Sequence, residues 1–159
     1  MGKDLLWKRD MYTIIACGVF QKEIEKLRDE LGFPFQARYL ASGLHVDFDE
    51  LKAALESELD SSDGQGTIVV YGQCHPRIEK ILEGHHAALI DCQNCVDALI
   101  TRKGMEDKAR QGLYFYLSPG WLDAWRDIFS RLGWTPAEAR LQMGSFIQAC
   151  LDYCMASIT

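Results

Sequence analysis

The sequence of 159 residues predicts an α/β fold: a parallel β-sheet of about five strands, helices on both of its faces, and extra helices at the C-terminus. Two observations predict it. Apolar β-rich runs alternate along the chain with amphipathic stretches of helical period, as in repeated strand–helix–strand units. The clearest run, "TIVVYG" at residues 67–72, is continuous and β-branched, which is typical of a strand buried on both faces. No repeat, linker or low-complexity stretch divides the chain, so we expect one domain over residues 1–159.

The expected strands are short runs of β-branched, aromatic and other apolar residues. In chain order they comprise residues 11–18, 33–40, 67–72, 86–90 and 112–117. Strands that are separated by helices run parallel, because each crossover returns the chain to the same end of the sheet. One sequence does not determine their order, and we expect the flavodoxin-like order 2-1-3-4-5 or a Rossmann-like order.

The expected helices are marked by apolar residues at helical spacing and by signals at their ends. They comprise residues 21–32, 47–60, 76–84, 94–103, 118–133 and 135–157. Gly32 is placed to stop the first helix, and Asp47 and Asn94 are placed to cap the second and the fourth. Thr135 and Glu138 have the spacing of a capping box at the start of the last helix.

The charge pattern narrows the classes of partner. The chain has 17 basic and 23 acidic residues, a formal net charge of −6, and its Lys and Arg do not cluster. A nucleic acid is therefore not expected as a partner, because phosphate binding needs clustered basic residues. No apolar run approaches the ~20 residues of a membrane span, and residues 1–10 lack the apolar core of a signal peptide. We expect a cytoplasmic protein with no membrane partner.

Cysteines follow the ends of several expected strands. Cys17 ends the first strand, Cys74 follows the third, and Cys92 and Cys95 follow the fourth. In a parallel sheet the carboxyl ends of all strands meet at one edge, and ligands bind there near the switch point of the strand order. Cysteines that only packed the core would not follow strand polarity. The sequence therefore predicts one shared site at this edge.

Thiolate and imidazole groups are ligands of zinc and of iron–sulfur clusters. We predict a metal site whose ligands come from five residues: Cys17, Cys74, Cys92, Cys95 and His45. Four further residues would surround these ligands: His75, Gly18, Gly72 and Trp121. "CQNC" at residues 92–95 is a C-x-x-C pattern that also occurs in thiol redox pairs. A nucleotide site is not expected, since neither a G-x-G-x-x-G nor a Walker pattern is present.

Packing or solvation explains the remaining cysteines and histidines better than a site does. Cys150 and Cys154 lie four residues apart among apolar residues of the last expected helix, which indicates helix packing. His85 and His86 precede the fourth strand in a loop, where we expect a solvated pair.

Four motifs, "IIACGVF", "YGQC", "QNCVDALI" and "YFYLSPGW", resemble those of an uncharacterised family, a domain of unknown function of methanogens and anaerobic bacteria. The resemblance runs from about Ile14 to Trp121. It implies an anaerobic setting, often beside corrinoid methyltransferase components. It also matches several residues to family positions: Cys17, His45, Cys74, Cys95 and the turn Pro119-Gly120-Trp121. Cys92 and His75 are less general in the family, and Thr101 stands where the family usually has glycine.

Three functions stay open. The first is metal binding, with an iron–sulfur cluster preferred over zinc because thiols are in excess and the resemblance implies an anaerobic setting. The second is a metal-free thiol enzyme, with Cys95 or Cys74 as nucleophile, His45 or His75 as base, and N–H groups of the strand-end glycines as oxyanion donors. The third is a module that binds a corrinoid or a corrinoid protein through one of these histidines.

Overall fold

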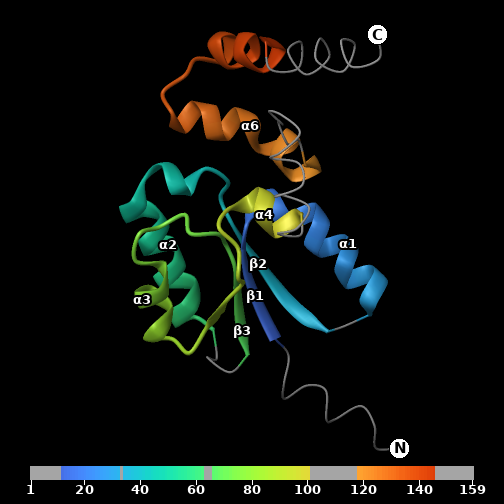
Figure 1. Ribbon diagram of the computed structural model, residues 1–159, viewed down its shortest axis with the longest axis vertical. Coiled ribbons are helices and arrows are strands. Elements are labelled where there is room, and N and C mark those ends of the chain that lie inside the picture. The colour runs from blue at the N-terminus through green and yellow to red at the C-terminus, as the bar shows by residue number, and fades with distance from the viewer. Residues whose placement is uncertain (1–11, 33, 63–65, 101–117, 146–159) are drawn as a thin grey trace, which may run out of the picture.

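The computed structural model describes residues 12–32, 34–62, 66–100 and 118–145 (Figure 1). These residues contain a four-stranded parallel sheet with helices on both faces, which confirms the α/β class. The strands are β1 (Tyr12–Cys17), β2 (Phe35–Leu40), β3 (Thr67–Val70) and β4 (Ala88–Leu89). The fifth expected strand, at residues 112–117, lies outside the described residues.

The described strands have the order β2-β1-β3-β4. Cys17 at the end of β1 pairs with Leu40 at the end of β2, and Ala16 pairs with Val70 at the end of β3. The three carboxyl ends are therefore level at one edge of the sheet. The switch point lies between β1 and β3, because the chain leaves β1 towards β2 and then returns past β1 to β3. A five-stranded order stays a prediction.

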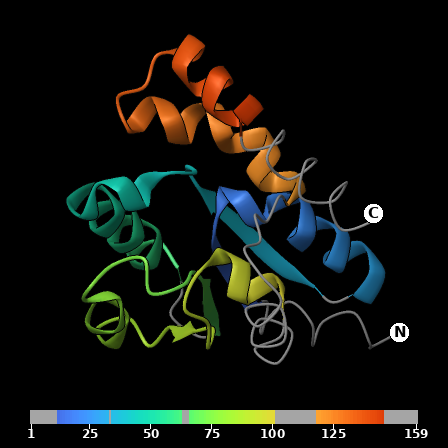
Figure 2. The same ribbon diagram turned by 45° about the horizontal axis from the view of Figure 1, so that its top comes forward.

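The helices cover both faces of the sheet and its carboxyl edge. Helix α1 lies on one side of the sheet, and α2 and α3 lie on the other (Figures 1 and 2). Helices α4 and α6 lie at the carboxyl edge (Figure 1). The bounds are α1 (Gln21–Leu31), α2 (Phe48–Asp60), α3 (Ile78–Glu83), α4 (Cys95–Leu99) and α6 (Pro119–Arg131), with the 3-10 turns η1 (Gly18–Phe20) and η2 (Leu44–Val46). Residues 136–145 are also helical, and no helix in the described ranges is long and apolar enough to cross a membrane.

The core lies between the central strands and the helices. Ile15 of β1 and Val69 of β3 are 0% exposed, and so are Leu51 and Leu55 on the inner face of α2. Burial of such side chains is the main stabilising contribution to a domain of this kind. The strands whose carboxyl ends carry the cysteines are therefore anchored in a packed core.

The helix ends agree with their sequence signals. Gly32 has φ +59° after α1, and the Asp47 side chain accepts hydrogen bonds from the N–H groups of Asp49 and Glu50 at 2.9 and 3.0 Å. Glu138 and Thr135 bond each other reciprocally, as a capping box requires. These predictions are confirmed because each signal acts within one turn of its own helix.

The fourth strand and the fourth helix have half or less of their expected length. The fourth strand has only residues 88–89, because His86 adopts φ +52° before it and Cys92 N–H donates to the Ile90 carbonyl just after it. Helix α4 ends at Leu99, where the sequence predicted a helix over 94–103, since Ile100 is extended.

Candidate functional site

Four cysteines lie at the carboxyl edge of the sheet, and none of them forms a disulfide. Burial raises the pKa of the Cys17 thiol most, and the neighbouring thiols of Cys74 and Cys95 raise it further. Cys95 likewise adds to the effect of burial in raising the pKa of Cys74. Three thiols from three separate segments are thus close enough to influence one another.

Backbone contact holds the segment after β3 against the segment after β4. Gln73 N–H donates to the Gln93 carbonyl at 2.9 Å. At Gly72 the two chains are so close that a Cβ atom would lie 2.5 Å from Asn94 Cα. Only glycine permits such an approach. The thiols of Cys74 and Cys95 are therefore positioned by a fixed contact between their loops.

Each of these three sulfurs has a backbone N–H nearby that favours the thiolate. The N–H of Val19 lowers the pKa of Cys17, and the N–H of Gly72 lowers that of Cys74. The N–H groups of Cys95 and Val96 lower the pKa of Cys95, at the start of α4. Burial is the larger effect in all three, so each pKa is raised overall and the thiols are protonated at neutral pH.

Cys92 has a different environment. Its thiol donates to the Tyr71 carbonyl at 3.5 Å, and the residue is buried. After burial, the carboxylate of Asp97 contributes most to raising its pKa, and Asp91 adds to it. Nearby negative charge opposes ionisation of this thiol. Cys92 is therefore less suited to form a thiolate than the other three.

Tyr71 is a member of the site that the sequence reasoning missed. Its side chain is 2% exposed, and its hydroxyl is buried without a hydrogen-bond partner of normal geometry. Burial raises its pKa, and the nearby thiols of Cys17 and Cys74 raise it further. The hydroxyl lies close enough to the Cys17 sulfur to lower the pKa of that thiol, although the geometry is poorer than that of a normal hydrogen bond. In the sequence, the only sign of this role is the hydroxyl of Tyr71 in the largely apolar run "TIVVYG", which predicts no more than the end of a strand.

The two histidines differ in what they can do. His75 is 3% exposed, and its Nδ1 accepts a hydrogen bond from Arg77 N–H at 3.0 Å while its ring packs edge-on against Phe48. This engagement supports a structural role for His75. Desolvation lowers the pKa of His45, so its imidazole is neutral at pH 7. Among the described residues no thiol contributes to that shift, so His45 stands apart from the three thiols.

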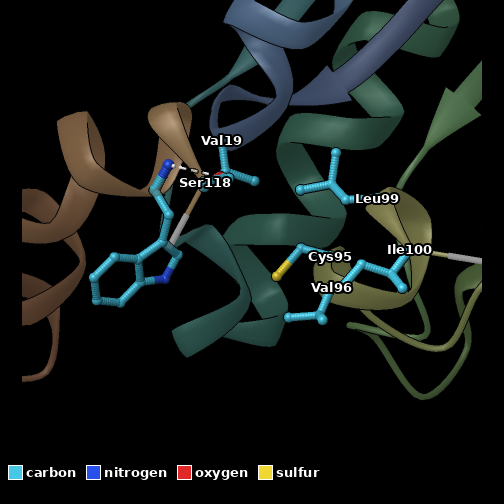
Figure 3. Close-up of a pocket in the computed structure, with 7 residues that line it drawn as sticks. Val19, Cys95, Val96, Leu99, Ile100 and Ser118 are labelled. Carbon is cyan, nitrogen blue, oxygen red and sulfur yellow. Dashed lines mark hydrogen bonds between the residues drawn. The ribbon is translucent and has the colours of Figure 1, made fainter. Parts of the chain in front are cut away.

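A cavity of about 210 Å³ lies beside Cys95, between α4 and the start of α6 (Figure 3). Its lining residues are Val19, Cys95, Val96, Leu99, Ile100, Ser118 and Trp121. In Figure 3 the Cys95 sulfur points away from α4 into the space that Val19 and Ser118 border. Trp121, expected beside the ligands, is one wall of this cavity. Gly18 instead packs against the loop after β2, where a Cβ would lie 2.8 Å from Ser42 Oγ.

The thiols in the described residues do not form a complete set of metal ligands. Within the described ranges, no group of three or more His, Cys, Asp or Glu side chains is arranged to hold a metal ion. The sulfurs of Cys17, Cys74 and Cys95 lie at one edge and influence one another's pKa, but as placed they do not form a metal-binding group.

Comparison with known proteins gives a family and no activity. Searches of curated proteins and of solved structures found no significant match. A family profile described as "Protein of unknown function" matches residues 39–155, most of the chain. The matched range contains Cys74, Cys92 and Cys95, whereas Cys17 precedes it. By this match the chain belongs to the DUF1638 family, as its motifs had indicated for an uncharacterised domain family.

Proposed function

We propose that the protein binds a metal centre through the thiolates of Cys17, Cys74 and Cys95, with an iron–sulfur cluster as the first choice and zinc as the alternative. One observation supports the proposal: the thiols of Cys17, Cys74 and Cys95, all at or beyond the carboxyl ends of strands, are close enough to affect one another's pKa, and each has a backbone N–H nearby. Such N–H groups stabilise thiolate ligands and adjust the reduction potential of a cluster.

The raised pKa values count against a free nucleophile. A catalytic cysteine needs a lowered pKa so that the thiolate is present at neutral pH. Burial raises the pKa of all three thiols here, so they stay protonated until a cation displaces their protons. The unpartnered Tyr71 hydroxyl supports the same proposal, because it could donate to the Cys17 thiolate once that thiolate forms.

Binding would draw the sulfurs together by side-chain rotation while the backbone stays in place. The Gly72–Asn94 contact fixes the loops, but χ1 of each cysteine can change between staggered rotamers. The fourth position would go to Cys92 or His45. Cys92 would first give up its bond to the Tyr71 carbonyl, and His45 would have to approach from η2.

Anaerobic purification followed by metal and sulfide analysis tests the proposal. We expect iron with acid-labile sulfide, or about one zinc per chain. Serine variants of Cys17, Cys74 and Cys95 should each lose most of the metal, whereas the matched control His85→Ala changes only a surface pair with Asp60 and should keep it. Cys92→Ser shows whether Cys92 is the fourth ligand. Protein free of iron and zinc, with all its thiols titratable, would refute the proposal.

A metal-free thiol enzyme is the second candidate, because the Cys95 sulfur borders a cavity large enough for a small substrate. Its weakness is the raised pKa of that thiol. Alkylation at neutral pH distinguishes the two: selective, rapid labelling of Cys95 in metal-free protein would favour the enzyme. Uniformly slow labelling of the cysteines would count against it.

The proposal also includes a cellular location, a strand order and a metabolic role. We propose a cytoplasmic protein with a fifth strand next to β4, in the flavodoxin-like order, that serves corrinoid methyl-transfer metabolism. If a corrinoid binds, His45 is the better cobalt ligand, because its imidazole is neutral whereas His75 is buried and engaged with Arg77. A cobalamin spectral change that persists in the His45→Ala and His75→Ala double variant would exclude ligation by either histidine.

A further inference from the structure

The cavity beside Cys95 is almost free of polar groups. Five of its lining residues are apolar: Val19, Val96, Leu99, Ile100 and Trp121. The other two are Cys95 and Ser118, so no Asp, Glu, Lys, Arg or His is among these described lining residues. A charged ligand would lose its hydration without gaining an opposite charge, which is costly. The described part of the lining therefore favours an uncharged molecule.

The size of the cavity sets the size of the ligand. An engineered apolar cavity of about 150 Å³ is known to bind benzene. At about 210 Å³ the present cavity would admit a molecule of about eight heavy atoms, by simple proportion to benzene.

Backbone contacts hold the walls of this cavity in place. Val19 belongs to η1, and the first turn of α6 packs directly on it: a Cβ on Gly120 would lie 1.8 Å from the Val19 carbonyl oxygen. Asn94 caps α4 by accepting from the N–H groups of Val96 and Asp97. Because both sides are anchored in this way, the cavity is largely formed before a ligand arrives.

Two polar groups mark where a polar end of the ligand would lie. The Ser118 oxygen accepts a hydrogen bond from Trp121 N–H at 3.1 Å, which leaves its O–H available as a donor (Figure 3). The Cys95 sulfur is the other. A ligand with one hydrogen-bond acceptor therefore suits the cavity better than a pure hydrocarbon of the same size.

We propose that this cavity binds a small, uncharged, largely apolar molecule with one hydrogen-bonding group, held against the Cys95 sulfur. Its identification as the substrate pocket of a metal centre rests on the proposed function, because Cys95 is one of the three thiolates. The binding itself does not require the metal. Failure of one proposal can therefore be distinguished from failure of the other.

Methyl NMR of the full chain tests the inference, with benzene, phenol and benzylammonium as probes of six to eight heavy atoms. The Val, Leu and Ile methyl groups are labelled, and metal content is measured on the same samples. We expect saturable shifts at Val19, Val96, Leu99 and Ile100 with phenol, weaker binding of benzene, and no shift with benzylammonium at neutral pH. Binding of benzylammonium as tight as that of phenol, or phenol shifts that spare these four residues, would overturn the inference.

A cavity-filling variant adds a second measurement. Val96→Phe places a larger side chain in the cavity and should weaken phenol binding at least tenfold. Leu122→Phe is the matched control, because Leu122 is exposed on α6 and does not line the cavity. Phenol affinity in a folded Val96→Phe variant equal to that of Leu122→Phe would overturn the inference, and if that variant does not fold, the wild-type titration decides alone. Phenol binding in protein that takes up no metal would refute the proposed function and leave this inference standing.

Discussion

Replacement of Gly72 by alanine tests whether the contact between two loops builds the site. Gly72 follows β3, and its Cα faces the backbone of Gln93 and Asn94 just before α4. An added Cβ would lie 2.5 Å from Asn94 Cα and 2.7 Å from both Asn94 N and the Gln93 carbonyl oxygen. All three contacts are to backbone atoms, so no side chain can swing aside to relieve them.

The size of the effect follows from how far the loops must separate. The closest contact must lengthen from 2.5 Å to at least 3.4 Å, the start of ordinary van der Waals separation. Overpacking of this kind costs about 1–3 kcal/mol. The same movement lengthens the 2.9 Å bond from Gln73 N–H to the Gln93 carbonyl, which contributes about 0.5–1.5 kcal/mol. We therefore expect Gly72→Ala to lower the free energy of unfolding by about 2–4 kcal/mol, less than the ~5–15 kcal/mol of a typical domain.

Urea unfolding of Gly72→Ala beside Gly84→Ala measures this effect. Gly84 has φ −69° at the end of α3, and a Cβ there would meet nothing within 4 Å. Alanine at such a position is expected to be neutral or to stabilise the protein by up to ~1 kcal/mol. Metal content of the folded Gly72→Ala variant should also fall, because Cys74 and Cys95 move apart. Equal unfolding free energies for the two variants would show that the loops are not in the contact described here.

Three further predictions concern stability. Asp47→Ala should lower the unfolding free energy by about 1 kcal/mol through loss of the α2 cap, whereas a change below ~0.3 kcal/mol would contradict the cap. Burial raises the pKa of all four described thiols, so the folded, metal-free protein holds these protons more tightly than the unfolded chain does. The contribution of the thiols to its unfolding free energy is fully present below the unfolded thiol pKa of ~8.5, so the unfolding free energy should fall as pH rises above that value, and a level profile from about pH 8.5 to pH 10 would refute this. Tyr71→Phe should change the stability of metal-free protein by less than about 1 kcal/mol, because the lost contact with Cys17 offsets the relieved burial of the hydroxyl, and it should weaken metal retention; unchanged metal retention would contradict the role of this hydroxyl.

The parts of the fold that follow from the sequence are those determined within one element. Asp47 and Thr135 mark the starts of helices because their side chains bond N–H groups two or three residues later. Continuous apolar runs mark β1 and β3 because both strands are covered on both faces. The fourth strand was overestimated, since "HAALI" has strand composition but only residues 88–89 pair with β3. Pairing depends on neighbours that local composition does not reveal.

The candidate site likewise has features that the sequence predicts and features that depend on tertiary packing. Strand polarity was enough to predict that Cys17, Cys74 and Cys95 would follow the carboxyl ends of strands. The C-x-x-C spacing suggested that Cys92 and Cys95 act together, whereas the structure directs the Cys92 thiol to the Tyr71 carbonyl and places carboxylates near it. Tyr71 could not be assigned to the site from sequence, because the position of its hydroxyl depends on how β3 packs beside β1. Such contacts between distant segments are set by tertiary packing.

Without a ligand, the carboxyl edge carries several groups whose burial is incompletely compensated. The Tyr71 hydroxyl has no hydrogen-bond partner of normal geometry, and burial keeps the surrounding thiols protonated beside N–H groups that would favour thiolates. A buried polar group without a partner needs an explanation in a natural protein, and a bound ion is one such explanation. A cation that replaces the thiol protons would satisfy the N–H groups and the hydroxyl together, and any ligand of the folded state alone raises stability by mass action. The buried groups whose burial is incompletely compensated are therefore those that the proposed metal would engage.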